Sequence, residues 1–409
     1  MNATHLAPRG PRTTRTPTLL LAVTCAVTAA NVYLCQPLLG PVAASLGTRP
    51  DVLGAVPTAT QLGYAAGILL IVPAGDSHDR RRLILGLGTA CAVALVACAV
   101  APTAGWLTVA SLAVGVCSPV PQLVTPLAVA LSAGDGGRTV GVVQGGLLVG
   151  VLASRAYAGS LADLAGWRCV YAGSALLTLV LVAVLARTLP LAPSAARGSY
   201  GTALASLPRL ARHPLVARTV LSGALVGIAF GAFWTALTFL LTDTYGMGAT
   251  AVGLFGLVAA VSALASPYAG RAVRRMGRRG ATAALAALVV LGWLVMLPGG
   301  SSLTALVVGV VVLDVGVWGG QVVCQTVLFT LDPAVHSRLN TLYFTLRFAG
   351  IALGSAIGAA AWGAGGWTAI AVTGAGAAAA GLVVGVLPGR AAGGAPGSRA
   401  SGPTPNDGL

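Results

Sequence analysis

The sequence has very few charged residues. Only 8% of its 409 residues are charged, against about 25% in soluble domains, and lysine is absent. It also contains no C-x-x-C, H-E-x-x-H or G-x-x-x-x-G-K-[ST] motif, so the usual signals for a zinc site, a metallopeptidase and a nucleotide-binding loop are missing. With only four histidines and nine acidic residues to build a catalytic centre, we expect no enzyme, no metal and no cofactor.

Long hydrophobic runs dominate the sequence instead. Hydrophobic residues make up 56% of the chain, and the mean hydropathy is +0.88. A helix needs about 20 mainly apolar residues to cross the hydrocarbon core of a bilayer. We therefore predict an all-α integral membrane protein in the lipid bilayer, with twelve transmembrane helices at residues 18–39, 52–74, 83–101, 104–131, 139–162, 166–188, 216–242, 249–270, 280–298, 303–330, 338–362 and 365–388.

One long polar break divides these spans into two sets of six. The break covers residues 189–215 and is interpreted as a cytoplasmic linker between an N-terminal six-helix bundle (18–188) and a C-terminal one (216–388). Residues 1–17 are expected to form a cytoplasmic N-terminus. Residues 389–409 are rich in glycine, proline and serine and are expected to form a disordered cytoplasmic tail.

The arginines indicate how the chain is oriented. With the N-terminus in the cytoplasm, the opposite loops hold only Arg49 and Arg168, as the positive-inside rule favours. The cytoplasmic arginines are then Arg9, Arg12, Arg15, Arg80, Arg81, Arg82, Arg138, Arg187, Arg197, Arg209, Arg212, Arg218, Arg271, Arg274, Arg275, Arg278, Arg279, Arg338, Arg390 and Arg399. The net charge of +15 is thus a topology signal, not a nucleic-acid-binding surface. We expect a monomer in the cell inner membrane with both termini cytoplasmic.

The two sets of six spans also repeat one another. The matching positions, all separated by 200 residues, are Leu131/Leu331, Arg138/Arg338, Gly150/Gly350, Gly166/Gly366 and Trp167/Trp367. Internal repetition of this kind is typical of transporters whose substrate site lies between the repeats. The repeat therefore predicts two pseudo-symmetric bundles and favours a rocking transporter over a channel.

The segment GYAAGILLIVPAGDSHDRRRLI resembles the conserved loop of the major facilitator superfamily, which runs roughly G-x-x-x-D-R-x-G-R-R. Three positions depart from that pattern: Val72 stands where the first glycine is usual, Ser77 where a basic residue is, and Asp79 where glycine is. The positions that carry the resemblance are Asp76, Asp79, Arg80 and Arg81. The likeness extends over essentially the whole chain and is greatest to the drug/proton antiporter-like, arabinose-efflux-like branch. In that family such a loop latches the two halves together, so the resemblance implies a gating loop. The alternative is that its arginines only anchor the loop in the cytoplasm.

The resemblance also implies that the first, fourth, seventh and tenth helices line the substrate cavity. Gln321 and Gln325 are four residues apart and share one face of the tenth helix. The expected cavity residues on these four helices are Asn31, Gln36, Gln122, Trp234, Gln321 and Gln325. The alternative for each polar residue is hydrogen bonding between helices, which is often worth only about 0.6 kcal/mol.

Three charged residues fall inside predicted spans, where charge is costly and usually functional. Asp314 lies about 17 Å along the tenth span, near the midplane. Because an unpaired charge there would be unfavourable, Asp314 is expected to meet an arginine. Arg155 would pair with it across the two halves, whereas Arg347 would pair with it inside the second half, and both pairings stay open. Asp314 is either a titrating carboxylate that carries the coupled proton or holds a cationic substrate, or a permanently ionised strut.

Together these features predict a secondary active transporter with a small-molecule substrate. The leading hypothesis is proton-coupled efflux of a small organic compound by alternating access, and the alternative is a proton-coupled uptake symporter for a sugar or other metabolite. The predicted cavity is weakly charged and partly apolar, which suits a neutral or amphipathic molecule.

Overall fold

The computed structural model describes residues 16–49, 52–132, 136–190, 200–259, 266–332 and 335–386. Throughout these ranges every regular element is a helix, which confirms the all-α class. The expectations for the first fifteen residues, for 191–199 within the linker and for the tail after residue 386 lie outside the described residues.

Eight helices build the N-terminal half. They are α1 (Thr16–Tyr33), α2 (Leu39–Leu46), α3 (Ala55–Ile71), α4 (Arg80–Ala99), α5 (Ala104–Cys117), α6 (Val120–Leu131), α7 (Gly136–Ala165) and α8 (Trp167–Thr188). Two of the predicted spans are each divided into two helices. The first span contains α1 and α2 within Thr18–Leu46, and the fourth contains α5 and α6 within Ala104–Leu131. The second helix of the fourth span, α6, begins directly after Pro119, which has no backbone N–H to continue α5.

In the described part of the C-terminal half, five helices are found. They are α10 (Pro214–Phe239), α11 (Ala249–Phe255), α13 (Ser266–Val295), α14 (Leu303–Leu328) and α15 (His336–Val386). The backbone leaves helical geometry at Gly277 in α13 and at Gly365 and Gly366 in α15, so each contains two straight arms. Ten segments of the described chain are long and apolar enough to cross a membrane. His336–Val386 is one of these ten and contains two arms, which correspond to the eleventh and twelfth predicted spans, whereas part of the predicted eighth span (249–270) lies outside the described residues.

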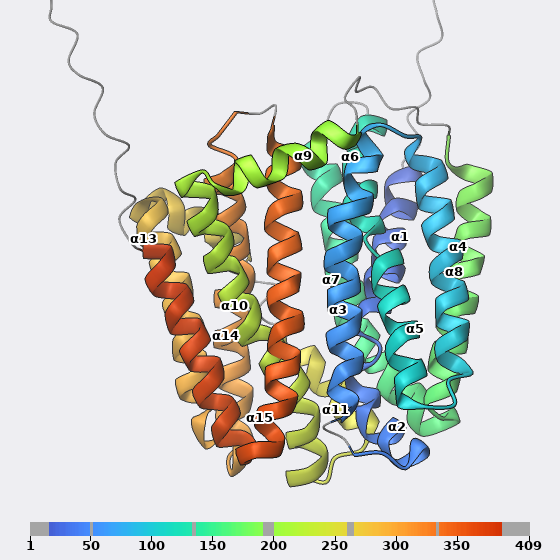
Figure 1. The fold of residues 1–409 in the computed structure, drawn as a ribbon, viewed down its shortest axis with the longest axis vertical. Coiled ribbons are helices and arrows are strands. Elements are labelled where there is room, and N and C mark those ends of the chain that lie inside the picture. The colour runs from blue at the N-terminus through green and yellow to red at the C-terminus, as the bar shows by residue number, and fades with distance from the viewer. Residues whose placement is uncertain are drawn as a thin grey trace, which may run out of the picture.

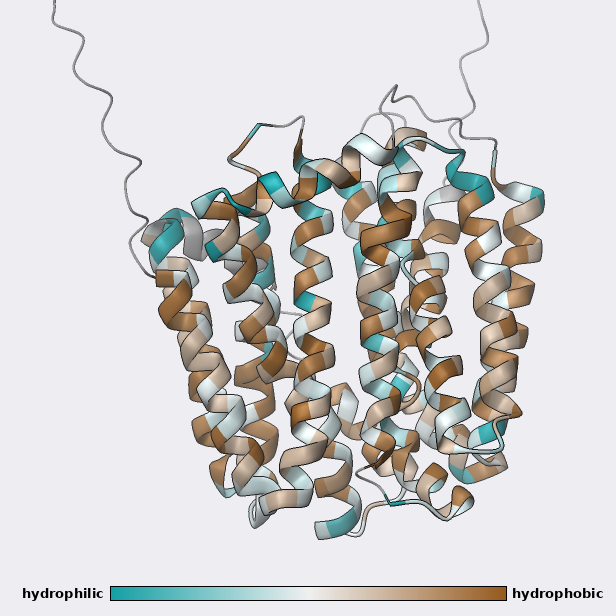
Figure 2. Ribbon diagram, in the orientation of Figure 1, coloured by the Kyte–Doolittle hydropathy of each residue, from teal (hydrophilic) through white to brown (hydrophobic). Residues whose placement is uncertain are grey.

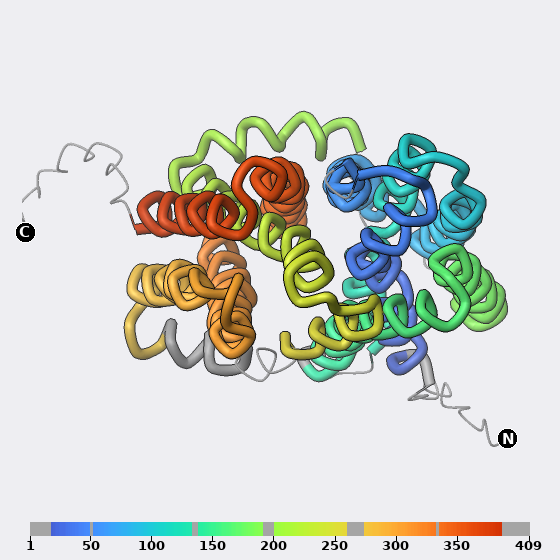
Figure 3. The backbone as a smooth tube through the Cα atoms, turned by 90° about the horizontal axis from the view of Figure 1, so that it is seen from below, coloured from blue at the N-terminus to red at the C-terminus, as the bar shows by residue number. Residues whose placement is uncertain are grey.

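The two halves lie side by side, as the view along the helices shows (Figure 3). Helices α4, α7, α10 and α15 all begin at the end shown at the top of Figure 1. We call this the arginine-rich end, because Arg80, Arg81 and Arg338 lie there. Helix α9 (Tyr200–Ala211), from the predicted linker, crosses this end from one half to the other (Figures 1 and 3). Hydrophobic residues cover most of the length of the helices, as expected for surfaces that face lipid (Figure 2).

The internal repeat is visible in the helix packing. A Cβ atom on Gly150 of α7 would lie 2.1 Å from the carbonyl oxygen of Ala26 in α1. A Cβ atom on Gly350 of α15 would lie 2.2 Å from the carbonyl oxygen of Ala224 in α10. The fifth span therefore packs on the first as the eleventh packs on the seventh, and in both cases only glycine permits so close an approach.

Candidate functional site

A cavity of about 760 Å³ lies between the two halves. Its walls come from α3, α6 and α7 on one side and from α14 and α15 on the other. Val72, Phe329 and His336, which stand at helix ends, are among its lining residues, so the cavity reaches the arginine-rich end.

A smaller pocket of about 60 Å³ continues this cavity towards the middle of the bundle. Gln122, Gln144 and Gln321 line both, which shows that the two spaces are continuous. The inner pocket is surrounded by aromatic rings, including Tyr64 and Phe348, whose centroids are 4.5 Å apart in an edge-to-face contact.

Three of the six predicted cavity residues line this space. Gln122 and Gln321 face both the cavity and its inner pocket, and Gln325 faces the wider part. The side chain of Gln325 also donates a hydrogen bond of 2.9 Å to Asn340 of α15. The shared face predicted for Gln321 and Gln325 is therefore the face that α14 turns towards the cavity.

The structure places the other three, Asn31, Gln36 and Trp234, among buried side chains that do not line the cavity. Asn31 donates to the hydroxyl of Thr178 over 3.2 Å, which joins α1 to α8 within the N-terminal half. Hydrogen bonding between helices, the alternative considered for each polar residue, thus describes Asn31.

Gln36 and Trp234 surround the buried Arg155 at the boundary between the halves. The Nε of Arg155 donates to the side-chain oxygen of Gln36 over 2.7 Å, and the guanidinium lies 3.8 Å from the centre of the Trp234 ring. The hydroxyl of Thr238 in α10 donates to the carbonyl oxygen of Gln36 over 2.9 Å. Helices α7 and α10 and the short 3-10 helix after α1 (Gln36–Leu38) are therefore joined through one polar cluster.

Asp314 of α14 lies beside this cluster and is 1% exposed. Asp314 and Arg155, from the opposite half, both lie close to the indole of Trp234. The two form no direct ion pair, and neither carboxylate oxygen has a hydrogen-bond partner, although the indole of Trp234 is close to both. Of the two pairings that the sequence left open, the structure thus favours the one across the halves, with the indole of Trp234 close to both groups.

Arg347 of α15 lies apart from this cluster. It is 3% exposed and lines the inner pocket. Near it lie the side chains of Tyr343, one turn earlier in α15, Cys324 of α14 and Tyr33 of α1. None of these is an acid.

The two halves are packed tightly at the end opposite the arginine-rich one. A Cβ atom on Gly159 of α7 would lie 2.1 Å from the carbonyl oxygen of Ala249 in α11. A Cβ atom on Gly54, just before α3, would lie 2.2 Å from the Cβ of Ala359 in α15. At this end the backbone of each half therefore comes into close contact with the other half, while the cavity separates the halves towards the other end.

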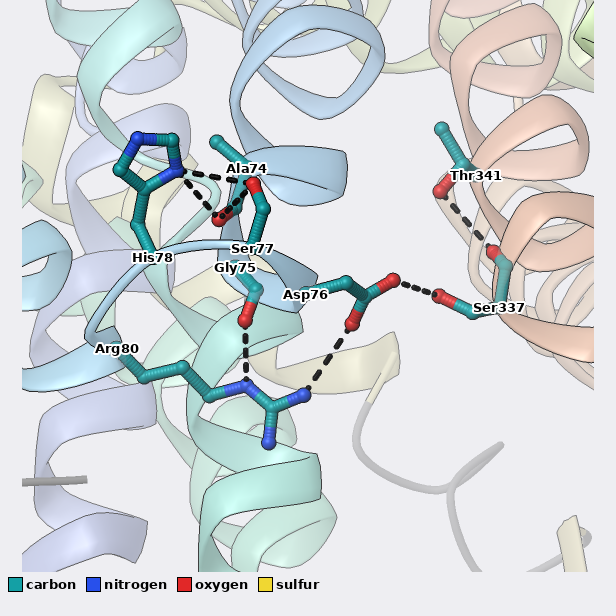
Figure 4. Close-up of polar contacts among 8 residues, drawn as sticks. All are labelled: Ala74, Gly75, Asp76, Ser77, His78, Arg80, Ser337 and Thr341. Atoms are coloured by element: carbon teal, nitrogen blue, oxygen red, sulfur yellow. Dashed lines mark hydrogen bonds and ion pairs between the residues drawn. The ribbon is translucent and has the colours of Figure 1, made fainter. Parts of the chain in front are cut away.

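One residue of the predicted gating loop, Asp76, contacts both halves at the arginine-rich end. One carboxylate oxygen of Asp76 accepts from Arg80 over 3.2 Å, and the other accepts from the hydroxyl of Ser337 in α15 over 3.1 Å (Figure 4). Asp76 therefore pairs with an arginine inside its own half and reaches the other half through a serine.

The two remaining loop residues make contacts within the N-terminal half. Asp79 caps α4 by accepting from the backbone N–H of Arg81 over 2.8 Å. The guanidinium of Arg81 donates to the carbonyl oxygen of Ala186 near the end of α8. These contacts hold the loop in place beside the Asp76 bridge.

Several lining residues were not among the predicted site residues. They include Gln144 of α7, Trp318 of α14 and Phe344 of α15. The family resemblance limited the cavity to the first, fourth, seventh and tenth helices, whereas the structure adds the second, fifth and eleventh. The spacing of Phe344 and Phe348 by four residues in the eleventh span was a signal for an aromatic face there.

Comparison with known proteins gives the same architecture. The model of the Major Facilitator Superfamily matches residues 21–355. The uncharacterized transporter YgaY of Escherichia coli O157:H7 is 35% identical over 360 residues, which are 87% of this chain and 91% of that protein. The chloramphenicol resistance protein of Streptomyces lividans is 28% identical over 259 residues, 59% of this chain and 63% of that protein.

Among solved structures, a mutant of the nucleoside transporter NupG superposes with a TM-score of 0.72 at 15% identity, and the match covers 90% of this chain and 98% of that one. A likeness at that identity concerns the fold alone. The match of the family model over most of the chain, with the similarity to YgaY, identifies the lineage: the chain belongs to the Major Facilitator Superfamily and is a multi-pass membrane protein of secondary transport.

Proposed function

We propose that the chain exports a small organic compound in exchange for protons, by alternating exposure of the central cavity, and that Asp314 carries the proton. The observation that carries the proposal is the position of Asp314. It is a buried carboxylate without a hydrogen bond, next to the cation of Arg155 in the other half.

The location of this pair couples proton binding to movement. The interaction of two charges falls with their distance and with the water around them. Arg155 and Asp314 stand on α7 and α14, so a rocking motion of the halves changes both their separation and their contact with the indole of Trp234. Protonation of Asp314 would remove its attraction to Arg155, and this bias on a two-state equilibrium is what proton coupling requires.

Export also requires that the cavity open to the cytoplasm in one state. We propose that the arginine-rich end is cytoplasmic, following the positive-inside rule. The cavity that reaches this end would then be loaded from inside the cell. The name of the relative from Streptomyces lividans, a chloramphenicol resistance protein, supports export of a compound toxic to the cell.

Proton coupling is tested in inverted membrane vesicles that are acidified inside, with a fluorescent dye reporting the pH gradient. Chloramphenicol, followed by a panel of neutral and charged aromatic compounds, is added as the candidate substrate. We expect a transported compound to dissipate the gradient with the wild-type chain and not with Asp314→Asn. The matched control is Asp243→Asn, because Asp243 is an exposed acid at the end of the seventh span and should keep the response.

The hypothesis predicts a second difference. Asp314→Asn should still exchange labelled substrate for unlabelled substrate across the membrane, because exchange needs the rocking motion but no net proton release. Dissipation of the gradient by Asp314→Asn at the wild-type rate would exclude Asp314 as the proton carrier.

Direction is tested separately by comparing inverted and right-side-out vesicles. Cys169 is exposed at the start of α8, at the end opposite the arginine-rich one, and reports the orientation of each preparation. We expect an impermeant maleimide to label Cys169 in right-side-out vesicles only. Substrate accumulation in the right-side-out vesicles, driven by an outside-acid gradient, would instead indicate uptake.

A further inference from the structure

The buried charges of the described chain do not balance. Its buried charged side chains are Arg155, Arg347 and Asp314, two cations and one anion. Asp314 lies beside Arg155, so the excess positive charge belongs to Arg347. Among the residues that the structure describes, Arg347 has no acid as a partner and forms no ion pair. A buried cation without a counter-charge is costly in a membrane interior, and such residues usually mark a substrate or ion path.

Arg347 is also in the right place to meet a ligand. It lines the inner pocket at the deep end of the cavity. The amide side chains of Gln122, Gln144 and Gln321 share the pocket and can donate further hydrogen bonds. These groups together offer an anion one full positive charge and several donors.

The remaining walls of the pocket are suited to an apolar body. Tyr33, Tyr64, Phe230, Trp318, Phe344 and Phe348 contribute aromatic rings. The space beyond Arg347 widens into the cavity of about 760 Å³, so a ligand larger than a simple inorganic ion can be accommodated. A binding pocket with many apolar walls and few polar groups recognises a ligand by its shape and orients it by the polar contacts.

We propose that the cavity binds an organic monoanion with an aromatic body, and that its carboxylate or equivalent group pairs with Arg347. The guanidinium presents a planar fork of N–H donors that matches a carboxylate with two parallel hydrogen bonds. This inference rests on the proposed function, because it takes the cavity as the transport site. It replaces the neutral or amphipathic substrate that the sequence suggested with an anionic one.

The test compares three probes of the same shape with the purified full-length chain in detergent. The probes are 2-naphthoate, its neutral amide 2-naphthamide, and the cation 2-naphthylmethylammonium, and binding is followed by calorimetry and by quenching of tryptophan fluorescence. Because a charge-assisted hydrogen bond is worth clearly more than a neutral one, we expect the anion to bind about tenfold to a hundredfold more tightly than the amide. Equal affinity for the three probes, or no binding of the anion, would overturn the proposal.

Variants then assign the preference to one residue. Arg347→Gln should abolish the preference for 2-naphthoate over 2-naphthamide, and Arg347→Lys should keep part of it. Arg338→Gln is the matched control, since Arg338 is on the same helix but contacts Ser206 of α9, outside the pocket. An unchanged preference in Arg347→Gln would refute the role of Arg347. The comparison of probes on the wild-type chain stands even if this variant does not fold.

The two proposals fail in different ways. Binding in detergent needs neither a proton gradient nor Asp314. If the chain prefers the anion through Arg347 but moves no protons, the proposal of proton coupling is refuted and the proposal of the anion site is supported. If the chain transports neutral compounds with protons and shows no anion preference, the proposal of the anion site is refuted and that of proton coupling is supported.

Discussion

Three glycines of α7 have different surroundings, and alanine substitutions at these positions separate conformational preference from fold stability. An alanine Cβ at Gly159 would lie 2.1 Å from the carbonyl oxygen of Ala249 in the other half. One at Gly150 would lie 2.1 Å from Ala26 in the same half, and one at Gly141 would meet nothing within 4 Å. We expect Gly159→Ala to disfavour the conformation in which the end opposite the arginine-rich one is closed.

The magnitude follows from the overlap. Heavy atoms in contact are normally separated by about 3.5 Å, so α7 and α11 must move apart by more than about 1 Å to accept the new methyl group. Overpacking a well-packed contact costs about 1–3 kcal/mol. Alternating access requires this contact to break in the state that is open at this end, so the cost should raise the population of that state by about 5-fold to 150-fold.

Cys35 provides the assay. It is buried in the same hydrophobic cluster as Ala249, at the end that must open. We expect the rate at which a maleimide modifies Cys35 in the purified chain, followed by mass spectrometry of its peptide, to rise with the open population. Gly159→Ala should raise this rate by the factor given above, and Gly141→Ala should leave it at the wild-type value.

Gly150→Ala distinguishes opening from general loosening. The contact between α7 and α1 lies within one half, so it is present in both conformations, and its disruption should lower the melting temperature without changing the rate at Cys35. Equal rates in the Gly159 and Gly141 variants would refute the reasoning, because the close approach of α7 to α11 would then have no part in closure.

Two further predictions concern single hydrogen bonds. Trp367→Phe removes a buried hydrogen bond of 2.8 Å from the indole to the carbonyl oxygen of Met296, so it should cost about 0.5–1.5 kcal/mol of stability and lower the melting temperature. Trp167→Phe, at the equivalent position of the first half, loses no such bond and should lower the melting temperature less. A larger drop for Trp167→Phe than for Trp367→Phe would contradict this account. Ser337→Ala removes the donor to Asp76 between the halves. Because Asp76 is partly exposed, the bridge is worth at most about 1 kcal/mol, or fivefold in population. Spin labels at the ends of α6 and α14 should report a modest shift towards longer distances, and an unchanged distance distribution would exclude a gating role for Ser337.

The helices and their order could be predicted from the sequence because they depend on local properties. A run of about 20 apolar residues must form a helix in lipid wherever its neighbours lie. The repeat at an offset of 200 residues also has a local cause. Gly166 and Gly366 both adopt positive φ, at 85° and 58°, a conformation that favours glycine. Each precedes a tryptophan that begins the last span of its half.

The site could be predicted only in part. Asp314, Arg155 and Arg347 were recognisable because charge within an apolar run is conspicuous, and Gln122, Gln321 and Gln325 because they fall on helices that line the cavity in the family. Which arginine lies near Asp314 depends on how α7 crosses α14, and the sequence of neither helix contains that information.

The sequence by itself determined the class of protein, the spans and the pairing of the two halves, since each follows from the composition and spacing of residues close together in the chain. The tertiary structure alone decided that Gln36 and Trp234 contact Arg155 and do not line the cavity, and that Asp76 accepts a hydrogen bond from Ser337. It also decided that Arg347, within the part of the chain that the structure describes, has no counter-charge. The physical reason is that these contacts join helices from different halves, whose rotation and crossing are settled by the packing of the whole bundle.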